Sequence, residues 1–422
     1  MQQFISVAVF AIVIIAIVTE KVHRAAAAMA GAVVLVLLRV LTVEKAVEYI
    51  DANTIGVLIG MMIFVAIVKN SGVFEYVAIK SAKIAGGDPW KVMIYFVVIT
   101  AVLSSFLDNV TTVLLVGPMT ITSARILDLN PVPFLLTQII ASNVGGTATL
   151  IGDPPNIMIG SAAGLTFMDF ITNTGLAVIF IMVALIIFMR LLYKKSFTNS
   201  QEAVMRVMEL DEKKAINDSV LLKKSVIMMV VVIIGFIFHS QLGLESSAIA
   251  LAAAAIMMII GRQNIDDIIS EVEWSTLVFF ISLFIVVGGM VEAGVIDKLA
   301  KILIEFTAGH EIMTMLVLLW ASALLSAILD NIPFVATLIP LVIAMGNDGI
   351  DVTPLWWAIS LGACLGGNGT LIGASANVVL SGISNRHGYP ITFKSYLKVG
   401  FPFMIISVVI SMIYLLVRYA WL

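Results

Sequence analysis

The sequence predicts an all-α membrane protein that crosses the lipid bilayer many times. Of its 422 residues, 61% are hydrophobic and 12% are charged, whereas soluble domains have about 45–50% apolar and about 25% charged residues. The mean hydropathy is +1.10, and apolar runs recur from Phe4 to Leu422. Little sequence remains for a separate water-soluble domain, so we expect a multi-pass protein of the cell (inner or plasma) membrane, with the bilayer as its surroundings.

Charge and cysteine content exclude several classes of function. The net charge is only −3, and the 24 lysine and arginine residues lie between apolar runs. No basic patch is therefore available for nucleic acid, and we predict no nucleic-acid partner. The single cysteine, Cys364, excludes a disulfide within the chain and a multi-thiolate metal site. Since the four histidines are scattered, we predict no metal centre and no cofactor other than a coupling ion.

The first half of the chain, residues 1–193, begins with an apolar run over residues 4–18. We interpret this run as a membrane span rather than a signal peptide, because no positive side chain precedes it and another apolar run follows at once. The further apolar runs of this half cover residues 25–41, 54–69, 92–107, 110–124, 132–148 and 167–192.

A polar stretch, residues 194–224, separates the two halves. It contains seven lysine or arginine and five aspartate or glutamate residues. Positively charged loops lie preferentially in the cytoplasm, so we predict a cytoplasmic linker. The second half, residues 225–422, has apolar runs at residues 225–239, 248–260, 275–291, 312–328, 332–345, 354–370 and 393–417.

The two halves are an internal duplication. At an offset of 222 residues, Asp108-Asn109 aligns with Asp330-Asn331, and at an offset of 221 the segment 149–152 aligns with the identical segment 370–373. Repetition over such a length indicates two copies of one structural unit.

Loop charges predict that the two copies have opposite orientations in the membrane. The loop 69–91 has four lysines and two acidic residues, whereas its equivalent, 292–311, has two lysines and four acidic residues. The turn with Lys21 and Arg24 is likewise matched by a turn without basic residues, 240–246. Because basic loops favour the cytoplasm, equivalent loops should lie on opposite sides, as in the inverted repeats of secondary transporters.

An Asp-Asn pair lies between two short apolar runs in each half. The runs 92–107 and 110–124 are shorter than the roughly 20 residues of a full span. We therefore predict re-entrant hairpins over 92–124 and 312–345, with Asp108 and Asp330 at their tips. A carboxylate within the membrane costs about 2.5–3.5 kcal/mol even on a mild scale. Simple helix capping is the alternative, but two related carboxylates favour Asp108 and Asp330 as proton carriers or as a sodium site.

A second motif predicts a broken helix in each half, over 132–157 and 354–378. Paired glycines, and Pro154-Pro155 in the first copy, interrupt each helix. The alternative is a packing kink, but matching breaks in both halves favour a binding site. Asp153 has only Ala374 as its counterpart, so we expect the substrate to lie nearer the first copy.

Together, the paired Leu-Asp-Asn tips and the motif Gly-Gly-Thr-Ala-Thr-Leu-Ile-Gly-Asp-Pro-Pro-Asn at residues 145–156 resemble the ion transporter superfamily. The most similar group contains the arsenite efflux permease ArsB, the sodium/proton antiporter NhaD and the mammalian P protein. The resemblance covers nearly the whole chain. It implies five spans and one hairpin per half, hence ten spans with both termini outside, an elevator-like transport domain and a homodimer.

The resemblance also implies a set of residues that bind substrate and ion. These are Asp108, Asn109, Thr111, Thr112, Thr147, Thr149, Asp153, Asn156, Asp330, Asn331, Asn368, Thr370 and Asn377. The dicarboxylate-carrying branch has Ser-Asn-Thr tips, so the tips of this chain speak against a citrate or succinate carrier.

We therefore predict a secondary active transporter, not an enzyme. The leading hypothesis is a proton-coupled antiporter that exports arsenite or a related metalloid hydroxide, and the alternative is a sodium/proton antiporter. The partner is thus a small inorganic solute, with proton or sodium as coupling ion, and association with a separate ATPase subunit stays open. A channel is a remote alternative, since it would not need a broken helix in each half. An intramembrane aspartyl protease is another, since Leu150 stands where the protease motif needs glycine.

Overall fold

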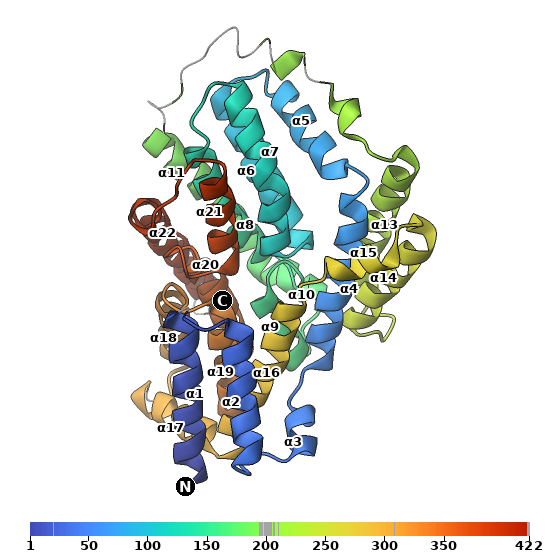
Figure 1. Ribbon diagram of the computed structural model, residues 1–422. Helices are drawn as coiled ribbons and strands as arrows, with labels where there is room; N and C mark the ends of the chain where they lie inside the picture. Colours follow the sequence, from blue (N-terminus) through green and yellow to red (C-terminus); the bar gives the residue numbers. More distant parts are fainter. Residues whose placement is uncertain are drawn as a thin grey trace.

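The computed structural model describes residues 1–19, 21–193, 197, 205, 207–209, 211–307 and 309–419. The described part is made of helices and connecting turns, without a β-strand (Figure 1). Much of the predicted linker lies outside the described residues, so its cytoplasmic location stays a prediction. At its end, the short helix η2 (Glu212–Ala215) packs against the first half.

The helices of the first half follow one another with short connections. They are α1 (Gln2–Thr19), α2 (Arg24–Leu37), α3 (Val43–Glu48), α4 (Ala52–Lys69), α5 (Val73–Ile84), α6 (Pro89–Phe106), α7 (Asn109–Ile126), α8 (Val132–Gly146), α9 (Pro154–Ala163), α10 (Phe167–Phe170), the π-helical turn η1 (Ile171–Gly175) and α11 (Leu176–Tyr193).

The second half has the same order of elements, except that the single helix α22 stands where the first half has α10, η1 and α11. Its helices are α13 (Ser219–Phe238), α14 (Ser246–Gly261), α15 (Ile265–Ser270), α16 (Trp274–Glu292), α17 (Val295–Phe306), α18 (Glu311–Ser326), α19 (Asn331–Asn347), α20 (Thr353–Gly366), α21 (Ser375–Arg386) and α22 (Phe393–Tyr419).

The halves exchange equivalent contacts. Helix α4 of the first half packs against α14 of the second, and α16, the equivalent of α4, packs against α2. In the same way α7 packs against α21, and α19 packs against α9. Such an exchange is what a two-fold relation between the copies produces. Each half therefore completes the other instead of forming a separate unit.

Seven of the described helices are long and apolar enough to cross a membrane, or up to eight if one bent pair forms a single span. The prediction of a many-span helical membrane protein is confirmed in this form, whereas the number of ten spans stays a prediction.

The first arm of the first predicted hairpin is longer than its apolar run: α6 begins at Pro89, capped by Asp88, and has 18 residues. It is one of the seven helices, so the re-entrant character of this arm also stays a prediction.

Both predicted helix breaks fall between two described helices. Helix α8 ends at Gly146 and α9 begins at Pro154, while α20 ends at Gly366 and α21 begins at Ser375. Glycine is needed beside the first break because α6 lies very close to α8. A Cβ atom at Gly145 would lie 2.2 Å from the carbonyl oxygen of Ala101.

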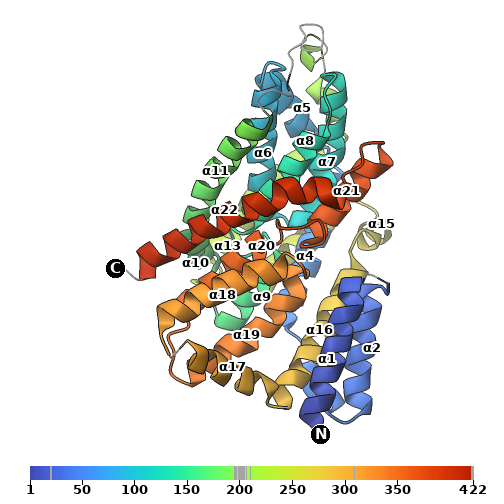
Figure 2. The ribbon, with the colours of Figure 1, turned by 90° about the vertical axis from the view of Figure 1, so that its left-hand side faces the viewer.

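Helices from both halves meet around the breaks. Helix α1 packs beside α2, and both pack against α16, with the N-terminus at the lower end in Figure 1. Figure 2 shows the long helix α22 crossing the molecule beside α18 and α20, which it contacts. The starts of α19 and α21, both in the second half, lie close to the start of α2, so the polar site forms between the two copies.

Candidate functional site

The two Asp-Asn tips are helix N-termini. Asp108 caps α7, since its side chain accepts hydrogen bonds from the backbone N–H of Thr111 at 2.9 Å and from the Thr111 hydroxyl. Asp330 caps α19 and accepts a hydrogen bond from the N–H of Ile332 at 3.3 Å. Capping is thus one role of both aspartates, and it fixes where each carboxylate lies.

Two equivalent asparagines close the helix breaks. The amide nitrogen of Asn156 donates to the carbonyl oxygen of Thr149 at 2.9 Å and to those of Gly146 and Thr147, each at 3.3 Å. That of Asn377 donates to the carbonyl oxygen of Thr370 at 2.9 Å and to that of Gly367 at 2.7 Å. Because the breaks leave carbonyl groups without helical partners, these side chains supply them with donors inside a buried site.

A chain of amide side chains connects the first tip to both breaks. Asn109 donates to Asn143 at 3.1 Å, and Asn143 donates to Asn368 and to Asn377, each at 2.9 Å. All four are buried, and the amide nitrogen of Asn368 has no protein partner. Asn143 is missing from the residues predicted from the resemblance, although it begins the first broken-helix motif.

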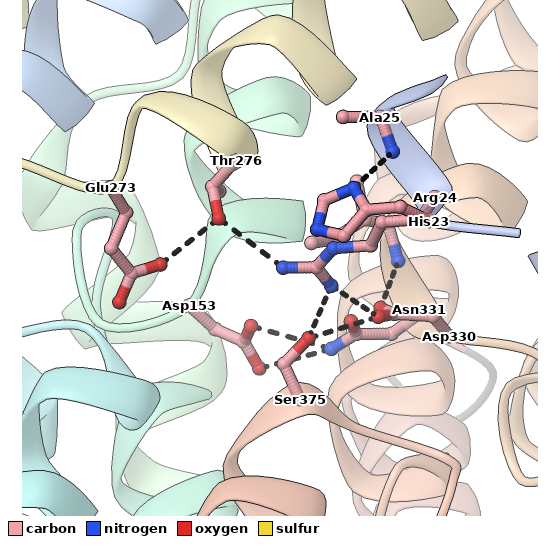
Figure 3. A network of polar contacts seen from close by, with 10 residues as sticks. His23, Arg24, Ala25, Asp153, Glu273, Thr276, Asp330, Asn331 and Ser375 are labelled. Atoms are coloured by element: carbon pink, nitrogen blue, oxygen red, sulfur yellow. Dashed lines mark hydrogen bonds and ion pairs between the residues drawn. The ribbon is translucent and has the colours of Figure 1, made fainter. Parts of the chain in front are cut away.

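Asp153 joins the first break to the second tip. Its side chain is fully buried, and the amide nitrogen of Asn331 lies 3.3 and 3.4 Å from its two carboxylate oxygens (Figure 3). A cavity of about 20 Å³ lies beside it, lined by Asp108, Asn109, Asp153, Glu273 and Asn331 among others. The structure therefore brings these four predicted residues together and adds Glu273.

Arg24 is the main functional residue that the sequence reasoning missed. Its guanidinium group forms an ion pair with Asp330 at 3.1 Å. It also donates to the hydroxyls of Ser375 at 2.6 Å and Thr276 at 3.2 Å (Figure 3). Sequence reasoning treated Arg24 only as a loop charge. Its partner is 306 residues away, and the only local signal is a basic residue at the start of an apolar helix.

Glu273 was also missed, although the repeat contains a signal for it. The Thr276 hydroxyl donates to Glu273 at 2.9 Å. In the first half, the Thr54 hydroxyl donates to Asp51 at 2.6 Å in the same arrangement. At the offset of 222 residues, Asp51 aligns with Glu273 and Thr54 aligns with Thr276. The repeat therefore contains the signal that pairs Glu273 with Thr276.

The predicted threonines have supporting roles. The hydroxyls of Thr147, Thr149 and Thr370 donate to backbone carbonyl oxygens, whereas the buried hydroxyl of Thr112 has no protein partner. Within the described ranges, no group of three or more His, Cys, Asp or Glu side chains is arranged to hold a metal ion. The small cavity is nevertheless lined by carboxylate and amide side chains, among them those of Asp108, Asp153 and Asn331.

Comparison with solved structures supports the class of the protein. The fold is similar to the crystal structure of the YdaH transporter of Alcanivorax borkumensis, with a TM-score of 0.63 at 14% sequence identity. The match covers 90% of this chain and 88% of that chain. This likeness shows the fold; together with the apolar helices and the match to a transporter family given in the next paragraph, it places the protein among the multi-pass membrane transporters. The predictions of a membrane protein and of no enzyme are confirmed.

The family follows from the sequence comparisons. Residues 14–362 match the family model CitMHS, described as "Citrate transporter", and the chain belongs to this family. It is 41% identical to an uncharacterized transporter of Mycobacterium tuberculosis over 98% of both chains. It is 33% identical to the P protein of Homo sapiens over 99% of this chain and 60% of that protein. The resemblance to the ion transporter superfamily is thereby confirmed.

Proposed function

We propose that this transporter is a secondary active antiporter in which protons and sodium ions compete for one site at Asp108 and Asp153. The observation that carries the proposal is the small cavity between these two carboxylates. Buried acidic residues in a membrane protein mark ion or proton pathways. Neither aspartate forms an ion pair with a described lysine, arginine or histidine, so both can exchange a cation.

The size and charge of the cavity favour a small cation over an organic anion. Its volume is about 20 Å³, and about 10–15 Å³ is the least that holds one water molecule. A dehydrated sodium ion or a hydronium ion fits such a space. The lining contains three carboxylates, those of Asp108, Asp153 and Glu273, and one guanidinium group, that of Arg24. Such a lining repels citrate, so the family description does not carry over to the substrate.

Arsenite export is the second candidate, and a larger cavity favours it. A cavity of about 310 Å³ is lined by Arg24 and Ser375, which also line the small cavity. The larger cavity has room for an uncharged metalloid hydroxide beside the ion site. Cys364 lies beside the first helix break, with its sulfur 3.5 Å from the side-chain oxygen of Asn156, but one thiol is a poor arsenic(III) site.

The exchange of contacts between the halves supports an inverted repeat and alternating access. In Figure 1, α4 leads upward from α3 to α5, whereas its equivalent α16 leads downward from α15 to α17. Inverted repeats allow a transporter to adopt two mirrored conformations around one site. An elevator-like movement and homodimerisation rest on the family resemblance alone and belong to this proposal, whereas association with a separate ATPase subunit stays open.

Labelling of single cysteines tests the topology. Cysteines at Gln2 and at Ser200, which lies outside the described residues, should react from opposite sides of the membrane, Gln2 from outside. Reaction of both from one side would contradict the inverted repeat.

Transport by purified protein in proteoliposomes tests the function. An imposed pH gradient should drive radioactive sodium uptake, and arsenite should be tested in parallel. Asp153→Asn and Asp108→Asn should abolish proton-driven uptake, whereas Asp267→Asn should not, since Asp267 is an exposed aspartate on α15. Proton-driven arsenite flux without sodium flux would favour the second candidate. Full activity of both site variants would overturn the proposed site.

A further inference from the structure

We propose that Arg24 is a resident cation that replaces a transported ion at the second Asp-Asn tip, so that only the first tip exchanges ions. This inference rests on the proposed function, in which the aspartates of the site bind cations or protons. It assigns to Arg24 the role of setting how many ions move in each transport cycle.

The two tips are equivalent in sequence but not in their surroundings. Asp108 and Asp330 occupy matching positions, and both cap the second helix of their pair. The residue that matches Arg24 in the second half is Ser246, which carries no charge. Asp330 therefore has a covalently attached cation at 3.1 Å, and no described basic side chain pairs with Asp108.

The guanidinium group of Arg24 is held from two sides. Its Thr276 contact and its position 5.3 Å above the ring of Phe279 connect it to α16. Its contacts to Asp330 and Ser375 connect it to the starts of α19 and α21. The Ser375 hydroxyl accepts from Arg24 and donates to Asp330 at 3.0 Å. Arg24 thus fills the coordination position at Asp330 that an incoming cation would need (Figure 3).

Arg24 also lies where ions would enter. Its side chain is 28% exposed and that of Asp330 is 14% exposed, and Arg24 lines both the cavity of about 310 Å³ and that of about 20 Å³. In the other half, Ser246 lines a cavity of about 320 Å³, whereas Asp108 lines the cavity of about 20 Å³. Arg24 thus shares a cavity with the aspartate of its tip, whereas the uncharged Ser246 does not share one with Asp108.

Charge balance explains the expected effect of removing Arg24. An ionised carboxylate in a poorly hydrated site needs a counter-ion or a proton. Without the guanidinium group, Asp330 should therefore take up one more sodium ion or proton in each cycle. Several charged and titratable groups line the two cavities that Arg24 lines, those of about 310 Å³ and about 20 Å³. They are His23, Arg24, Asp108, Asp153, Glu273 and Asp330. The test must therefore separate Asp330 from the other acidic groups.

The central variant is Arg24→Ser, which gives the second tip the residue found at the matching position. Two quantities are measured in proteoliposomes with the membrane potential held at zero: the sodium gradient at which net flux stops, and the steepness of the sodium dependence. If the wild type exchanges one proton for one sodium ion, a tenfold proton gradient balances a sodium gradient of about tenfold. If the variant moves one extra proton for each sodium ion, the same proton gradient balances a sodium gradient of about hundredfold. An extra sodium ion instead raises the Hill coefficient from about one toward about two.

Three further variants show that the effect belongs to the charge on Asp330. Arg24→Lys should keep the wild-type coupling, because it retains a cation. The double variant Arg24→Ser/Asp330→Asn should also restore wild-type coupling, since both charges are removed together. Adding guanidinium ion to Arg24→Ser should return both quantities toward wild type. Arg39→Ser, an exposed arginine just after the opposite end of α2, is the matched control and should change neither.

The outcomes separate the two proposals. Wild-type protein that shows no proton or sodium coupling overturns the proposed function. Coupled wild-type protein with unchanged coupling in Arg24→Ser overturns the resident-cation proposal. If Arg24→Ser is inactive, the double variant decides: recovery of transport with wild-type coupling supports the proposal, and inactivity of both variants makes Arg24 a structural residue. Size-exclusion chromatography confirms that each variant is folded.

Discussion

Replacement of Gly145 by alanine should destabilise the protein by separating α6 from α8. The added Cβ atom would lie 2.2 Å from the carbonyl oxygen of Ala101 and 2.5 Å from its Cα atom. Favourable contacts between such atoms need about 3.5–4.0 Å, so the helices would have to move apart by more than about 1 Å. Overpacking of this kind costs about 1–3 kcal/mol.

Gly382 provides the matched control for this substitution. It lies inside helix α21, and a Cβ atom there would meet no atom within 4 Å. Alanine is the better helix former, so Gly382→Ala should leave the stability unchanged or raise it by up to about 1 kcal/mol.

The free energy of unfolding should be measured for both variants in detergent micelles by denaturant titration. We expect Gly145→Ala to unfold at a lower midpoint than wild type, and Gly382→Ala at an equal or higher one. Because the helix break follows Gly145 directly, the same variant should also weaken transport. Equal midpoints for Gly145→Ala and wild type would show that α6 and α8 are not in such close contact, and the description of the break would fail.

Three other predictions follow from described contacts. Asn377→Ala leaves two carbonyl oxygens of the second break without their donor and should lower the free energy of unfolding by about 1–3 kcal/mol, measured by the same titration. Cys364 is fully buried, so maleimide should label the native protein only after denaturation, and rapid labelling would contradict this burial. The hydrogen bond from Lys83 lowers the pKa of Glu212, so this interaction stabilises η2 above the ordinary pKa of a glutamate. It should be lost as the pH falls through the lowered pKa. Hydrogen exchange of η2 should then quicken, and pH-independent protection after correction for intrinsic exchange would refute this.

The helix caps and breaks could be predicted because their signals are local. Asp-Asn pairs start helices, and Gly-Gly and Pro-Pro interrupt them, whatever surrounds them. The repeat strengthened these signals, since Asp-Asn and Gly-Gly both occur twice at a nearly constant offset, whereas Pro-Pro occurs in the first copy alone. Asp108, Asp153 and Asn331 line one cavity in the structure. The local signals did not predict this meeting, and only the family resemblance placed the three residues in one site.

Arg24 could not be predicted because its function depends on the tertiary structure. Nothing near Arg24 in the sequence indicates that α2 begins beside α19, and its ion pair joins residues of opposite halves. The length of α6 was underestimated for a related reason. The apolar run begins at residue 92, but the helix includes Pro89, Trp90 and Lys91 behind the Asp88 cap, and polar residues at a helix start are not visible in a hydropathy pattern.

The contact between α4 and α14 has a consequence for biosynthesis. Helix α4 ends at Lys69, whereas α14 begins only at Ser246, so α4 leaves the ribosome long before its partner exists. Gly60 of α4 fits directly against the backbone of Ala250, where a Cβ atom would lie 2.5 Å from the carbonyl carbon. Until more than half of the chain has been translated, this surface faces lipid or a membrane chaperone. A prematurely terminated chain therefore exposes an unmatched helix face, which gives membrane quality control a feature by which to recognise and degrade it.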